Sequence, residues 1–145
     1  MSPYSTLRKF LVPAAFAGAL AACGGDETQP SEDHTPHTYH LIINGEEVSA
    51  PYTFVAGQVV RVQIKFFNKA GEDLDDVESS HFGGLTFNPT SLATVARVGA
   101  HNFQFDVTVG AQGSGTVVVS FGHDEAADEE SFPAEAVTVE GEATL

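Results

Sequence analysis

The chain has 145 residues and carries 20 aspartates and glutamates against 6 lysines and arginines, so its formal net charge is −14 at pH 7. This acidity excludes nucleic acid and anionic lipid surfaces as partners of a folded face, because both repel negative charge. A well-solvated surface explains the acidity, and attraction of cations is the alternative explanation.

The N-terminal segment is typical of a secretory signal. Arg8 and Lys9 are followed by an almost uninterrupted apolar run over residues 10–22, which is too short to span a bilayer comfortably. The run ends in Leu20-Ala21-Ala22-Cys23, which resembles the lipobox of bacterial lipoproteins. That resemblance implies cleavage by signal peptidase II just before Cys23 and acylation of this residue with fatty acids such as palmitate. The alternative is a buried cysteine at the end of an apolar helix.

Cys23 is the only cysteine, so its lipidation would leave an exported chain without thiols for a disulfide, despite the oxidising compartment. Two or three acyl chains hold a protein durably at a membrane, whereas one chain binds only marginally. The next residue is Gly24 rather than aspartate, which in Gram-negative lipoproteins permits transfer to the outer membrane. The resemblance therefore implies an anchor in the outer membrane, on its periplasmic or its surface face.

Removal of residues 1–22 as the signal peptide leaves 123 residues, enough for one compact domain. All 20 acidic residues but only 4 basic residues lie in this part, so its charge is 4 − 20 = −16. Residues 23–37 are polar and rich in turn formers, and we expect the lipidated cysteine to be followed by a flexible linker there. The domain is expected over residues 38–140, with a short tail over residues 141–145.

The domain is expected to be all-β, because apolar and polar residues alternate along it. Every second residue is apolar in residues 60–66 and 103–109, which predicts two strands with one buried face each. A turn is expected at residues 68–71, and a glycine-rich loop at residues 110–115 precedes a strand at residues 116–121. Further strands are expected at residues 39–43, 52–55, 85–87, 94–98 and 136–139. Seven or eight short strands predict a sandwich of two antiparallel sheets.

Three segments resemble the order of features in bacterial Ig-like domains. They are residues 55–60 (VAGQVV), residues 91–95 (SLATV) and residues 113–119 (GSGTVVV). The resemblance covers most of residues 39–139 and implies a single Ig-like β-sandwich. The chain lacks the tryptophan often found before the second segment and has an additional phenylalanine-rich strand at residues 102–109.

The sequence contains no serine-centred glycine elbow, phosphate loop or zinc-protease helix motif, so we expect it not to be an enzyme. The histidines are the remaining candidates for a functional site. His34, His37 and His40 are spaced by three residues, and in a polyproline-type segment their rings would fall on one side. This pattern favours a loose site for copper, nickel or zinc. The alternative is a linker that binds no metal, because a mobile segment has to be ordered before it binds.

His81 and His123 form the second group. Each has the same strand parity as the apolar residues beside it, which predicts that both point inward. Glu78 lies three residues before His81 and Asp124 directly follows His123, so these four residues predict a nitrogen and oxygen site for zinc, copper or nickel. The alternative is two loop residues at opposite ends of the domain. His101 is interpreted as a turn residue without a role.

These observations predict a non-enzymatic, lipid-anchored binding module of the cell envelope that holds a divalent transition metal. The first alternative is a structural or adhesive lipoprotein that contacts protein or glycan without a metal. The second is a substrate carrier for an envelope complex. The metal hypothesis requires the imidazoles of His81 and His123 to lie within about 5 Å of each other. The adhesive hypothesis requires an exposed apolar or aromatic patch.

Overall fold

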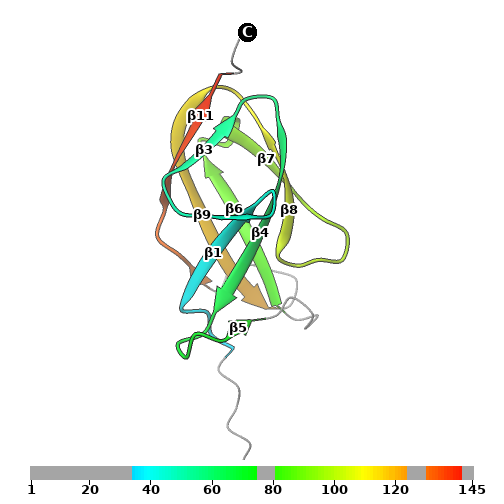
Figure 1. Ribbon diagram of the computed structural model, residues 1–145, viewed down its shortest axis with the longest axis vertical. Coiled ribbons are helices and arrows are strands. Elements are labelled where there is room, and N and C mark those ends of the chain that lie inside the picture. The colour runs from blue at the N-terminus through cyan, green and yellow to red at the C-terminus, as the bar shows by residue number, and fades with distance from the viewer. Residues whose placement is uncertain (1–33, 75–80, 124–129, 142–145) are drawn as a thin grey trace, which may run out of the picture. The chain divides into compact units, whose positions relative to one another are not determined.

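The computed structural model describes residues 34–74, 81–123 and 130–141, which form eleven β-strands and one short 3-10 helix at Thr90–Leu92. No helix in these three ranges has the length and apolar character needed to cross a bilayer. The strands form two sheets (Figure 1).

The first sheet has the strand order β2-β1-β4-β8-β7, with β5 added beside the end of β4. All of its pairs are antiparallel. Its strands are β1 (Thr38–Ile43), β2 (Glu46–Val48), β4 (Val59–Phe67), β5 (Asp73–Leu74), β7 (Ala93–Arg97) and β8 (Gln104–Val109).

The second sheet has the order β10-β9-β11-β3, and β6 pairs with the other edge of β9. Its strands are β3 (Tyr52–Val55), β6 (His81–Asn88), β9 (Gly113–His123), β10 (Glu130–Ser131) and β11 (Glu135–Glu140). The pair of β11 with β3 is parallel, whereas the other pairs of this sheet are antiparallel.

This topology is that of an Ig-like sandwich, as the sequence predicts. The run β1-β4-β8-β7 corresponds to the A-B-E-D sheet of such a domain, and β6, β9 and β11 correspond to the C-F-G sheet. The chain crosses between the sheets after the β1–β2 hairpin, so that β3 joins the free edge of β11 in parallel. The very short strands β2, β5 and β10 were not predicted, because segments of two or three residues show no alternation.

The core lies between the inner faces of the two sheets and is rich in phenylalanine. Alternate residues of β4 are buried from Val60 to Phe66, which confirms the predicted amphipathic strand. The Phe66 ring contacts the rings of Phe103 and Phe121, with centroids 4.9 and 5.2 Å away. Gly83 on β6 leaves room for these rings, since a Cβ there would lie 3.2 Å from Phe66 and Phe103.

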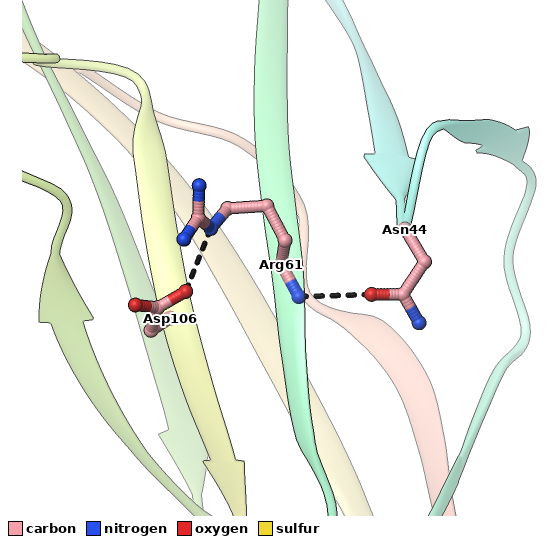
Figure 2. A network of polar contacts seen from close by, with 3 residues as sticks. All are labelled: Asn44, Arg61 and Asp106. Carbon is pink, nitrogen blue, oxygen red and sulfur yellow. Dashed lines mark hydrogen bonds and ion pairs between the residues drawn. The ribbon is translucent and has the colours of Figure 1, made fainter.

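Two turns of the first sheet are held by asparagine side chains. Asn44 and Gly45 form the β1–β2 turn with positive φ angles, the expected asparagine-glycine hairpin chemistry. Asn44 Oδ1 also accepts a hydrogen bond from the backbone N–H of Arg61, whose guanidinium binds Asp106 on β8 (Figure 2). In the predicted turn at residues 68–71, Asn68 Oδ1 accepts hydrogen bonds from the backbone of Ala70 and Glu72.

The predicted glycine-rich loop is shorter than expected, because β9 already begins at Gly113. The reason is the ladder with β11, in which Val137, Thr138 and Val139 pair with Gly115, Ser114 and Gly113. At Gly115 the backbone of β9 passes so close to the β6–β7 connection that a Cβ would overlap the carbonyl oxygen of Asn88 and lie 2.6 Å from Leu92 Cδ1. Glycine therefore allows the strand to continue where any side chain would collide with its neighbour.

We predict that Gly115→Ala lowers the free energy of unfolding by about 2 kcal/mol or more, because the added methyl group meets backbone rather than a flexible side chain. Ser114→Ala on the same strand is the control and is expected to change it by less than about 0.5 kcal/mol, since Ser114 is exposed. Urea unfolding followed by circular dichroism measures both. Equal stability of the two variants would contradict the steric argument.

Candidate functional site

Two histidines face each other at one end of the second sheet. His81 is the first residue of β6 and His123 is the last residue of β9, and the antiparallel register pairs them directly. Their ring centroids are 5.0 Å apart and their planes are inclined by 69°. Figure 1 shows that β6 begins and β9 ends at the end of the domain where β5 lies.

Both imidazoles stand on the border of the hydrophobic core. His81 is 3% exposed and His123 is half-buried. The ring of Phe121, two residues before His123 on the same face of β9, has its centroid 5.3 Å from that of His81 and 5.4 Å from that of His123. The inward parity predicted for these histidines is therefore found, and β6 continues through Gly83 rather than ending there.

A third imidazole, that of His34, lies against that of His81. Its ring centroid is 5.2 Å from that of His81, although His34 precedes the first strand. The chain reaches this place because residues next to His34 are already attached to the domain: Pro36 is buried, and the N–H of His37 donates to the carbonyl of Phe67. His34, His81 and His123 are called the histidine group below.

Of the other two histidines in the first predicted set, His40 has surroundings that differ from those of the histidine group. His40 lies in β1, and its Nδ1 is 3.0 Å from a carboxylate oxygen of Glu47 on β2. Its ring also packs 4.9 Å from that of Phe67. The prediction that the rings of His34, His37 and His40 fall on one side of a polyproline-type segment is wrong for His40. This residue lies in a strand, where positions three apart face opposite sides of the sheet.

Glu78 and Asp124, the carboxylates predicted to complete the second site, lie outside the described residues. Within residues 34–74, 81–123 and 130–141, no group of three or more histidine, cysteine, aspartate and glutamate side chains is placed to hold a metal ion. The structure thus brings His81 and His123 together, and adds the ring of His34, which reasoning from the sequence had assigned to a different group.

A second polar feature, which the sequence analysis missed, joins the two sheets at their edges. The hydroxyls of Tyr39 on β1 and Tyr52 on β3 lie close enough to influence each other's pKa, near the carboxylate of Glu135 on β11. Both tyrosines occupy the start of a predicted strand, and a hydroxyl at such a position is a signal for a partner across the sandwich.

The surroundings keep both phenols protonated. Burial is the largest cause that raises the pKa of Tyr39 far above its ordinary value near 10, followed by the charge and the hydrogen bond of Tyr52 and the charge of Glu135. Burial and then Glu135 also raise the pKa of Tyr52, against the hydrogen bond from Tyr39, which lowers it.

No protein-family model matches the chain, and no curated protein matches it. Among solved structures, the chain is similar to the crystal structure of the S-layer protein SbsC domains 4 and 5. The sequences are 16% identical and the TM-score is 0.47, over 72% of this chain and 46% of the other. The chain thus spans about half the length of that structure.

We predict that stability falls as the pH rises above about 10. The unfolded chain loses its phenol protons there, whereas the folded chain retains them. Each increase in pH therefore favours the unfolded state, until the pH reaches the raised pKa of the tyrosines in the folded state. Residues 24–145 contain only Tyr39 and Tyr52 and no tryptophan, so phenolate absorbance reports on this pair alone. Native protein should show less phenolate at pH 10.5 than protein in urea, in which about two tyrosines should titrate near pH 10.

The matched variant is Tyr39→Phe, which keeps the ring and removes the hydroxyl with the raised pKa. Its urea midpoint should decline less steeply between pH 9.5 and 11 than that of the wild type. Native tyrosines that titrate near pH 10 would refute the prediction.

Proposed function

We propose that the chain is an exported, non-enzymatic binding module of a bacterial envelope, anchored to the outer membrane through a lipidated Cys23. We further propose that it binds one divalent transition metal ion between His81 and His123. The support for the anchor is the resemblance of residues 20–23 to a lipobox after a charged and apolar leader.

The metal proposal depends on the separation of the two rings. Two imidazoles that share one zinc ion, each at roughly 2.1 Å from nitrogen to metal, have ring centres on the order of 5 Å apart. The ring centres of His81 and His123 are 5.0 Å apart, and that of His34 is 5.2 Å from His81. Binding requires the rings to turn until their nitrogens face one ion, with water or further side chains as the remaining ligands.

The chemistry of the histidine group defines the class of ion. Neutral imidazole nitrogen suits zinc, copper and nickel, whereas calcium and magnesium prefer oxygen ligands. The ring of Phe121 borders the pair on the core side, so one side of the site is closed to water. The charge of −16 after residue 22 raises the local concentration of any cation.

The adhesive alternative has less support from the described surface. An adhesive face needs a contiguous apolar or aromatic patch. Among the described residues, the exposed large hydrophobic side chain is that of Val59, at 63% exposure, at the start of β4. A single exposed valine is ordinary on a soluble protein, so the histidine group is the better basis for a function.

The metal proposal predicts that residues 24–145 bind one zinc, copper or nickel ion per chain. His123→Ala removes a half-buried ligand and should weaken binding about tenfold or more in isothermal titration calorimetry. His101→Ala is the control, because His101 is exposed and its backbone N–H belongs to the turn after β7. A bound ion should also raise the midpoint of thermal unfolding of the wild type. No uptake, or equal affinity in the two variants, would overturn the proposal.

The anchor predicts that Cys23→Ser moves the protein from the membrane fraction to the soluble fraction of fractionated cells, because no acyl chain is attached. Gly24→Asp is the matched control. It retains the cysteine and should stay in the membrane fraction, with its distribution shifted from the outer to the inner membrane. Continued membrane association of the Cys23→Ser protein would count against lipidation at this residue.

A further inference from the structure

A cavity of about 320 Å³ lies at the edge of the sandwich, away from the histidine group. One wall is formed by β1, by β2 and by the connection from β2 to β3. The other wall is formed by Tyr52 of β3 together with Phe132 and Glu135, which lie just before and at the start of β11. Its volume is at the lower end of the range of small-molecule sites.

Aromatic rings form much of the cavity wall. The rings of Tyr39 and Phe132 meet edge to face with centroids 4.8 Å apart. Tyr52 is 4% exposed, so packing fixes its ring, and it lines the same cavity as Tyr39. Three rings from three separate segments are therefore held in place around one space, and their faces and hydroxyl oxygens offer partial negative charge to a ligand.

The charged groups at the cavity are carboxylates rather than amines. Glu47 and Glu135 line it together with His37 and His40, and its described lining includes no lysine or arginine. Glu47 is already engaged by His40, at 3.0 Å, which leaves Glu135 as the carboxylate beside the tyrosine pair.

Three of the four lysines and arginines of the domain have partners elsewhere. Arg61 binds Asp106 on the outer face of the first sheet, and the guanidinium of Arg97 lies over the ring of Phe82. Lys65 pairs with Asp73 at 3.8 Å. None of these three residues lines the cavity, so a ligand would have to supply the positive charge that Glu135 favours.

From this arrangement we infer that the cavity is a binding site for a small organic ammonium ion. Aromatic rings attract such a cation through their negative faces, and a neighbouring carboxylate supplies the full opposite charge. Hydrated metal ions do not gain from aromatic walls in the same way. The inference is independent of the metal proposal, since His34, His81 and His123 do not line the cavity.

The test uses choline as the probe and its neutral carbon analogue, in which the quaternary nitrogen is replaced by carbon, as the matched control ligand. Both are titrated into residues 24–145 at low salt and pH 8, and binding is followed by NMR chemical shifts. Choline is expected to bind with a Kd on the order of 1 mM, and the neutral analogue about tenfold more weakly. Resonances of Tyr39, Tyr52 and Phe132 should move, and those of His81 and His123 should not.

Substitutions then test whether choline binding depends on the carboxylate charge of Glu135 or only on the shape of the cavity. Glu135→Gln keeps the size of the side chain and should weaken choline binding about fivefold or more, with little effect on the neutral analogue. Glu140→Gln on the same strand is the control, because Glu140 is exposed and does not line the cavity. Thermal unfolding of both variants verifies that they are folded.

The inference is overturned if choline and its neutral analogue bind equally, or if choline causes no shifts at about fifty times the expected Kd. It is also overturned if Glu135→Gln and Glu140→Gln bind choline alike. Loss of zinc binding in the His123→Ala protein leaves choline binding intact if both sites are real, so the two proposals fail separately.

Discussion

The register between β6 and β9 is the constraint on which the rest of the domain depends. Eight consecutive residue pairs, from His81 with His123 to Asn88 with Thr116, fix which face of each strand meets the core. A slip by one residue would turn Leu85, Phe87, Val117 and Val119 outward, because strand side chains alternate with a period of two. The same slip would separate the two histidines. One alignment therefore determines both the packing and the candidate metal site.

The core has to maintain this alignment without a covalent link between the sheets. The domain has no cysteine, whereas many Ig-like domains join their two sheets by a disulfide. Here the contact between sheets is made by the rings of Phe66, Phe103 and Phe121, which meet edge to face or tilted beneath Gly83. Aromatic pairs contribute about 0.5–1.5 kcal/mol each beyond the area they bury, so several of them provide a substantial part of a typical domain's stability.

Much of the fold follows from local patterns. Alternation along residues 60–66 and 103–109 predicted the correct buried faces of β4 and β8. The predicted start of β9 was wrong because its first residues belong to the strand through pairing with β11, which lies more than twenty residues later in the chain. Local alternation carries no information on such contacts between distant segments.

The same distinction explains the site. Strand parity predicted that His81 and His123 point inward. The order of residues in the chain does not show that β6 and β9 are neighbours, so the proximity of the two histidines was a condition of the metal hypothesis and not a prediction. The grouping of His34 with His37 and His40 relied on a regular polyproline segment, whereas the hydrogen-bonded ladder of β1 begins at Thr38. The tyrosine pair was missed because Tyr39 and Tyr52 belong to different sheets and meet only across the edge of the sandwich.

Both candidate sites draw on the first few described residues of the chain. His34 contributes a ring to the histidine group, and five residues later Tyr39 contributes a wall of the cavity. Pro36 and His37 attach the segment between them to the domain by burial and by the hydrogen bond to Phe67.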